Sequence, residues 1–83
     1  MINSSREQIQ QAMATGQTFV VGMRWCPYTQ RAVHNAPKNA QILFLEDYSD
    51  FADTLDWLKQ SFQHDTVPLV FIDGEFCGGS EVF

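Results

Sequence analysis

The apolar and polar positions of this chain fall into two patterns: short continuous apolar runs and longer stretches with helical spacing. The runs are rich in β-branched and aromatic residues, which is typical of buried strands. They occupy residues 18–23, 41–46 and 68–72. After the last run, Asp73 and Gly74 predict a two-residue hairpin, so residues 75–77 are expected to return as a fourth strand.

Two of the intervening stretches carry clear helix boundaries. Ser4 is a suitable N-cap with Glu7 three residues later, and this first helix is expected to stop at Gly16. A second helix is predicted over residues 27–36, because proline fits a first helical position and Pro37 prevents continuation.

A third helix is predicted from Asp50 onward. Its apolar side chains recur at helical spacing and are expected to share one face: Phe51, Leu55, Leu58 and Phe62. The order of elements predicts an α/β fold, in which helices flank a mixed four-stranded sheet. The first two strands are expected to be parallel and the last two antiparallel. Because no linker or repeat divides the sequence, residues 1–83 are interpreted as one domain.

Composition narrows the classes of function. The hydrophobic fraction of 45% indicates a compact core rather than disorder. Ten acidic against five basic residues leave a net charge of −5, so we expect neither nucleic acid nor a membrane as partner. The N-terminus lacks the apolar core of a signal peptide, and two cysteines are too few for a disulfide framework. These features predict a cytoplasmic location, and we expect a monomer.

The candidate chemistry centres on Cys26, at the predicted junction of strand and helix. A helix N-terminus carries a partial positive charge and unpaired N–H groups, and both favour a thiolate over a thiol. We therefore predict that Cys26 is a nucleophile with a pKa below the usual value of about 8.5, although many free cysteines are simply buried hydrophobic residues. Thr29 stands where a dithiol enzyme has its second cysteine, so the predicted redox site has one sulfur.

Three motifs, in order and on the expected elements, resemble the glutaredoxin family of the thioredoxin fold over the whole chain. Cys26-Pro27-Tyr28-Thr29 resembles the family's Cys-Pro-Tyr-Cys active site, in a monothiol variant that lacks the second cysteine. Thr66-Val67-Pro68 resembles the family's Thr-Val-Pro, in which the proline is cis. Gly78-Gly79-Ser80-Glu81 resembles its Gly-Gly motif with an acidic residue nearby. Together the motifs are far more specific than any one of them.

The resemblance implies a thiol–disulfide oxidoreductase of electron transport and cell redox homeostasis, acting on protein–glutathione mixed disulfides. Cys26 would be catalytic, and the remaining active-site motif would be Pro27, Tyr28 and Thr29. Glutathione would be co-substrate and partner, together with glutathionylated proteins. The residues implied to bind it are Arg24, Thr66, Val67, Pro68, Gly79, Ser80 and Glu81. In this interpretation the Val67 backbone pairs with the extended tripeptide, and Glu81 receives its amino group. No metal site is expected from the histidines and cysteines.

Two features depart from the family pattern. Glutaredoxins often have a lysine three residues before the cysteine, where it helps to hold a glutathione carboxylate, but this chain has Met23. Arg24 is expected to take over that role. The C-terminal helix of the family is also missing, so we expect either a chain truncated after Phe83 or a sheet face that is covered in another way.

Alternative functions remain open. One is a [2Fe–2S] carrier bridged by glutathione in a dimer, although Pro27 counts against it, since cluster-holding relatives usually have a small residue there. Another is a glutathione transferase N-terminal domain, which shares the fold but is disfavoured by the tandem glycines. A third is a binding domain that lost catalysis with the second cysteine. Cys77 is expected to fill the core, and its alternative role is that of a resolving thiol for Cys26.

Overall fold

A computed structural model describes residues 4–83 of the chain; the first residues of the predicted domain, 1–3, lie outside this description. The elements in order are α1 (Ser5–Ala14), β1 (Phe19–Gly22), α2 (Pro27–Asn35), β2 (Gln41–Phe44), η1 (Leu45–Asp47), α3 (Phe51–Phe62), β3 (Leu69–Ile72), β4 (Glu75–Gly78) and η2 (Ser80–Val82), where η denotes a 3-10 turn. The predicted α/β architecture is confirmed. None of the helices within this range has the length and apolar character needed to cross a bilayer.

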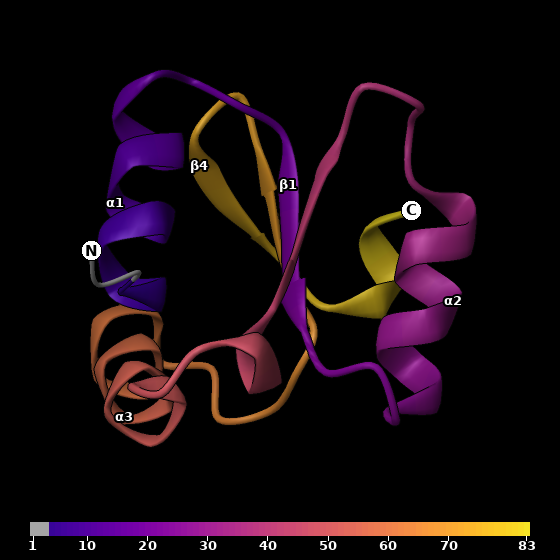
Figure 1. The fold of residues 1–83 in the computed structure, drawn as a ribbon. Helices are drawn as coiled ribbons and strands as arrows, with labels where there is room; N and C mark the ends of the chain where they lie inside the picture. The colour runs from indigo at the N-terminus through magenta and orange to yellow at the C-terminus, as the bar shows by residue number, and fades with distance from the viewer. Residues whose placement is uncertain (1–3) are drawn as a thin grey trace.

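The four strands form one mixed sheet in the order β2-β1-β3-β4. β1 and β2 are parallel and β3 and β4 are antiparallel, as the sequence predicted. β1 and β3 are also antiparallel. Asp73 and Gly74 both have positive φ, 52° and 84°, so the predicted tight hairpin joins β3 to β4. Figure 1 shows α1 and α3 on one face of the sheet, and α2 with the C-terminal segment on the other.

The core follows from the two-residue periodicity of β1, whose residues are all buried. Phe19 and Val21 belong to the larger core cluster on the α1 and α3 side, where the Phe19 ring stacks on Phe71 with centroids 4.3 Å apart. Val20 belongs to a smaller cluster with Ala32 of α2. Because both faces of β1 are covered, its C-terminal end is held firmly where the chain turns toward Cys26.

α1 and α3 are joined by hydrogen bonds at their N-termini. The Asp50 carboxylate accepts from Ser4 Oγ at 2.9 Å, from the Ser5 backbone N at 3.0 Å and from Ser5 Oγ at 2.6 Å. The hydroxyls of Ser5 and Thr54 lie 2.6 Å apart and are buried. Hydrogen bonds from Ser5 and Ser4 outweigh burial and hold the pKa of the Asp50 carboxyl well below its usual value. Asp50 therefore stays ionised and links two helices distant in sequence.

Two local predictions were wrong. The strand expected over residues 41–46 ends at Phe44, because Leu45 turns fully into the core and begins η1. The predicted apolar face of α3 is displaced, since Phe51 is 41% exposed whereas Thr54 is buried. The Thr54 hydroxyl is hydrogen-bonded to the Ser5 hydroxyl, so this polar side chain can be buried. The hydrophobic pattern had predicted Phe51 on the buried face instead.

The segment after β4 takes the place of the expected additional helix start. Residues 80–82 form only the short turn η2. Val82 and Phe83 pack against the small core cluster that contains Val20 and Ala32. In Figure 1 this segment lies beside α2, so part of the second sheet face is covered by the end of the chain itself.

Candidate active site

Cys26 lies at the N-cap of α2, where the chain leaves β1. Its backbone is extended, with φ −82° and ψ 120°, and its N–H donates to Met23 O at 3.1 Å. Pro27 opens the helix, where its missing N–H costs nothing. The residue Cys26 is 8% exposed, and its thiol donates to the Val67 carbonyl oxygen, with 3.9 Å between Sγ and O. The predicted position at a helix N-terminus is confirmed.

The surroundings of the Cys26 sulfur act on its pKa in opposite directions. Burial alone raises the pKa. The backbone N–H and the hydroxyl of Thr29, with the backbone N–H of Tyr28, lower it by hydrogen bonding to the sulfur. The donors prevail, and the pKa of Cys26 falls below its ordinary value. The two N–H donors belong to the first turn of α2 and have no intrahelical partners, so the thiolate is stabilised by the start of the helix.

Thr29 does more than fill the position of a missing cysteine. It is completely buried, and its Oγ1 accepts the Met23 N–H at 3.3 Å, which leaves the hydroxyl proton free to point at Cys26. The side chain packs so tightly against Gly22 that a Cβ there would clash with Thr29 Cγ2. The last residue of β1 must therefore be small for Thr29 to stay beside the sulfur.

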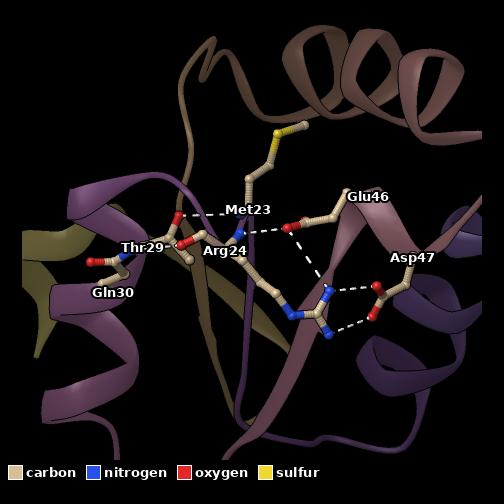
Figure 2. Close-up of polar contacts among 6 residues, drawn as sticks. All are labelled: Met23, Arg24, Thr29, Gln30, Glu46 and Asp47. Atoms are coloured by element: carbon tan, nitrogen blue, oxygen red, sulfur yellow. Dashed lines mark hydrogen bonds and ion pairs between the residues drawn. The ribbon is translucent and has the colours of Figure 1, made fainter.

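The loop before Cys26 is braced by contacts that sequence reasoning missed. The Arg24 N–H donates to Glu46 Oε2 at 2.7 Å, and Gln30 Nε2 donates to the Arg24 carbonyl oxygen at 2.7 Å (Figure 2). Glu46 is 22 residues away in sequence and carries no motif that would connect it with the loop. Only the parallel pairing of β1 with β2 brings the two together.

The structure places the Arg24 guanidinium outside the hollows beside Cys26, and its predicted role in glutathione binding stays a prediction. Its guanidinium forms a two-pronged ion pair with Asp47, with Nη2 to Oδ2 at 2.9 Å, and lies over the Phe44 ring. This hydrogen bonding lowers the pKa of the Asp47 carboxyl. Figure 2 shows the Met23 and Arg24 side chains leaving the backbone in opposite directions. Consecutive residues point to opposite sides of the loop, so Arg24 cannot simply replace a lysine at position 23.

A groove beside Cys26 consists of two neighbouring hollows, which we name by one residue of each. The Met23 hollow has a volume of about 460 Å³ and is lined by Met23, Trp25, Cys26, Tyr28, Leu55, Asp65, Thr66 and Val67. The Glu81 hollow has a volume of about 230 Å³ and is lined by Tyr28, His64, Thr66, Val67, Pro68, Gly79, Ser80 and Glu81. Both hollows share the stretch of chain at Thr66 and Val67, so the groove brings together every predicted glutathione-binding residue except Arg24.

The middle of the groove is formed by the predicted Thr-Val-Pro turn and an aromatic wall. The peptide bond between Val67 and Pro68 is cis, as expected from the motif. Tyr28 is 61% exposed and Trp25 is 70% exposed, so two large apolar side chains stand in solvent around the sulfur. Exposed aromatic groups beside a reactive sulfur offer contact area to a substrate.

The Glu81 hollow contains an internal hydrogen bond that the sequence did not reveal. The Glu81 carboxylate folds back and accepts the Gly79 N–H at 3.1 Å. Backbone hydrogen bonds from Glu81 itself and from Gly79, with the nearby His64, hold the pKa of the Glu81 carboxyl below its usual value despite some burial. A Cβ on Gly78 would lie 2.7 Å from Glu81 Oε2, so the first glycine makes room for this arrangement.

Three residues of the groove were not assigned to it from the sequence. Leu55 carried only a helical-face signal, and Asp65 and His64 lie in a loop without any motif. The His64 ring packs edge-on against Phe76 with centroids 5.3 Å apart, which holds the imidazole at the groove. Only the return of the chain from α3 to β3 brings these side chains beside Cys26.

Cys77 does not fill the core, so that prediction was wrong. It is exposed on the edge strand β4, beside an irregularity in the pairing of β3 with β4, and its thiol donates to the Glu75 carbonyl oxygen at 3.4 Å. Both cysteines are free. Within residues 4–83, Cys26 is the cysteine that lines the groove, so the structure does not bring a resolving partner into it.

Comparison of this structure with solved structures places it among known folds. A dithiolic glutaredoxin from Trypanosoma brucei brucei matches with a TM-score of 0.75 and 25% identity, over 96% of this chain and 81% of that one. Oxidized glutaredoxin 2 from Chlamydomonas reinhardtii matches with a TM-score of 0.76 and 29% identity, over 90% and 74%. A buckwheat glutaredoxin–glutathione complex matches with a TM-score of 0.78 and 28% identity, over 90% and 71%.

The chain has the fold of a glutaredoxin. The predicted resemblance to this family is therefore confirmed in three dimensions. No family model and no curated protein matches the sequence. The glutaredoxin neighbours support a glutaredoxin-type oxidoreductase, and the arrangement around Cys26 suits thiol–disulfide exchange. Among residues 4–83, no group of three or more His, Cys, Asp or Glu side chains is placed to hold a metal ion.

Proposed function

We propose that this chain is a glutathione-dependent oxidoreductase that removes glutathione from protein–glutathione mixed disulfides with Cys26 as its one redox sulfur. The observation that carries the proposal is the position of Sγ, which combines a lowered pKa at the start of α2 with a groove along Val67. A solved structural neighbour of this chain is a glutaredoxin–glutathione complex, which supports glutathione as the ligand.

The proposed reaction has two exchange steps. The Cys26 thiolate attacks the glutathione sulfur, the mixed disulfide breaks, and the target protein leaves as a thiolate that takes up a proton. Cys26 is then joined to glutathione by a disulfide bond. The thiolate of a second glutathione attacks the glutathione sulfur of this adduct, so glutathione disulfide leaves and the Cys26 thiolate is restored. Each step exchanges one disulfide for another, and the target is reduced to a thiol as the second glutathione is oxidised from a thiol to glutathione disulfide.

The backbone at Val67 explains how glutathione would be oriented for attack. The Val67 carbonyl oxygen lies 3.9 Å from Sγ, and both Cys26 and Val67 line the Met23 hollow. An extended tripeptide that pairs with this backbone, like an added strand, would bring its central cysteine to Cys26. Such positioning directs the thiolate to the glutathione sulfur, whereas exchange in free solution does not select between the two sulfurs of the mixed disulfide.

The test is an exchange assay with a glutathionylated peptide, with glutathione as reductant. We expect turnover in wild type, equal turnover in Cys77→Ser, and background rates in Cys26→Ser. Intact-mass measurement without added glutathione should show one glutathione on Cys26 in the Cys77→Ser variant. Equal rates for wild type and Cys26→Ser, or an adduct on Cys77 alone, would defeat the proposal.

A second variant tests the monothiol part of the proposal. Thr29→Cys restores a second thiol next to Cys26, which should create activity on intramolecular protein disulfides that wild type lacks. Exchange with the glutathionylated peptide should remain. If wild type already reduces an intramolecular disulfide as fast as Thr29→Cys does, the single-sulfur mechanism is wrong while glutathione dependence survives.

A further inference from the structure

The two hollows of the groove differ in the charges that they present to a ligand. The Glu81 hollow contains an ionised carboxylate whose neighbouring backbone donor, the Gly79 N–H, is already occupied by it. Glutathione carries an ammonium group beside a carboxylate at its γ-glutamyl end, but a carboxylate alone at its glycyl end. The carboxylate of the exposed residue Glu81 therefore favours the γ-glutamyl end, which has no net charge, over the negatively charged glycyl end. A ligand with an amino end is therefore expected to place that end in the Glu81 hollow.

The orientation of the amino end fixes the position of the other end. An extended γ-glutamylcysteinyl ligand that runs along Val67, with its sulfur at Cys26, enters the Met23 hollow with its carboxyl end. Among the residues that line this hollow, all within residues 4–83, none is Lys, Arg or His. The nearest cation in sequence, Arg24, is paired with Asp47 outside the groove.

The Met23 hollow is unfavourable for a free carboxylate. Its lining is largely apolar, with Met23, Trp25 and Leu55, and its one acidic side chain is Asp65. A carboxylate there would lose hydration without gaining a partner, and would meet the like charge of Asp65. A neutral amide avoids both costs, and its additional atoms gain contact with the apolar lining.

We propose that this site prefers glutathione whose glycyl carboxylate is masked as an amide over glutathione whose glycyl carboxylate is free. The proposal rests on the proposed exchange function and names its substrate class. The residues that determine the preference are Met23 and Asp65 in the Met23 hollow. Glu81 sets the orientation by holding the amino end.

The experiment compares two mixed disulfides of one reporter peptide, one with glutathione and one with glutathione amide, on the Cys77→Ser protein. Cys26 attacks the glutathione-side sulfur and releases the peptide thiol, which is followed as a second-order rate. Rates are divided by those of dithiothreitol with the same disulfides, which removes intrinsic reactivity. We expect the amide to react about threefold to fivefold faster, the size of one exposed charge interaction.

Variants of the lining residues identify the cause of the preference. Met23→Lys should raise the rate with free glutathione by about fivefold and cancel the preference for the amide. Asp65→Asn should raise the rate with free glutathione by about twofold. Gln10→Lys adds the same charge on the exposed side of α1 and should change neither the rate with free glutathione nor the preference for the amide. Asp65 is exposed, so its substitution remains informative if Met23→Lys does not fold.

The outcomes separate the two proposals. If both disulfides react equally fast with the Cys77→Ser protein, the substrate preference is wrong and the exchange function stands. If neither disulfide forms an adduct on Cys26, the exchange function fails and the preference fails with it. A faster reaction of the glutathione disulfide than of the glutathione amide disulfide with the Cys77→Ser protein would also overturn the preference.

Discussion

The N-termini of α1 and α2 present the same physical feature, unpaired N–H groups with a partial positive charge, but the chain uses them differently. At α1, Ser4 caps the helix and the Asp50 carboxylate accepts from Ser4 and Ser5. At α2, the cap position is taken by Cys26, whose side chain forms no conventional capping hydrogen bond. A strong oxygen acceptor fills one terminus, and a weak sulfur acceptor occupies the other.

The difference shows how one chain divides stability from reactivity. Asp50 ties α1 to α3, and its charge never needs to change during function. The Cys26 sulfur must form and break a disulfide bond in every turnover, so a strong capping hydrogen bond to this side chain would hinder the reaction. We therefore expect substitutions at the α1 terminus to change the free energy of unfolding and those at the α2 terminus to change the rate of exchange.

The largest expected effect is at the α2 terminus. Cys26→Ser should reduce glutathione exchange to background, because the nucleophile is lost. The same substitution should raise the free energy of unfolding by about 0.5–1 kcal/mol, because serine is a preferred N-cap. Urea denaturation and the exchange assay on the same preparation measure both. A marked loss of stability would mean that the sulfur is a structural member of the core.

The converse substitution is Asp50→Asn at the α1 terminus. It removes the charge that three donors from Ser4 and Ser5 share, so we expect a loss of about 1–2 kcal/mol in the free energy of unfolding. The exchange rate of the folded protein should stay within twofold of wild type. Asp53→Asn, on the exposed side of α3, is the control. Loss of exchange without loss of stability would break the comparison.

The contribution of Asp50 should also disappear in acid. Its folded-state pKa lies below the unfolded value of about 3.9, so the stabilisation is fully present above that value. It is lost progressively as the pH falls through and below about 4 toward the folded-state pKa. The difference in unfolding free energy between wild type and Asp50→Asn should therefore shrink with falling pH. A difference that stays constant from neutral pH to pH 3 would rule out this role of the charge.

The smallest expected effect concerns the donor next to the sulfur. Thr29→Val removes the hydroxyl that lowers the pKa of Cys26, so the midpoint of alkylation against pH should rise by a few tenths to about one pH unit. Measurement in a Cys77→Ser background isolates the Cys26 thiol. Thr29→Ser keeps the hydroxyl and should leave the midpoint near that of wild type. An unchanged midpoint in Thr29→Val would show that the backbone N–H groups suffice.

Local signals in the sequence predicted most of the architecture. The apolar runs, the Asp73-Gly74 turn and the position of Pro27 identified the strands, the hairpin and the start of α2, because each depends on neighbouring residues alone. The same reasoning located Cys26 at a helix N-terminus. It failed for Thr54 and Phe51. Thr54 is buried because its hydroxyl is hydrogen-bonded to the hydroxyl of Ser5, which lies 49 residues earlier in the sequence.

The composition of the groove depended on tertiary structure in a different way. Arg24 and Met23 are adjacent in sequence, yet the loop directs the Arg24 guanidinium to Asp47 and places Met23 in the hollow beside Cys26. Likewise, Cys77 is exposed because β4 is an edge strand, which depends on the sheet order rather than on its own neighbours.

The sequence by itself determined where the reactive sulfur stands along the chain and that no second thiol follows it at position 29. Helix capping, turns and apolar periodicity act over a few residues, so these features are encoded locally. The presence of Asp65 and the absence of the Arg24 guanidinium beside the sulfur were decided only by the fold, because their loops meet or separate according to strand pairing. Electrostatic interactions depend on distances in space, and spacing along the chain does not determine those distances.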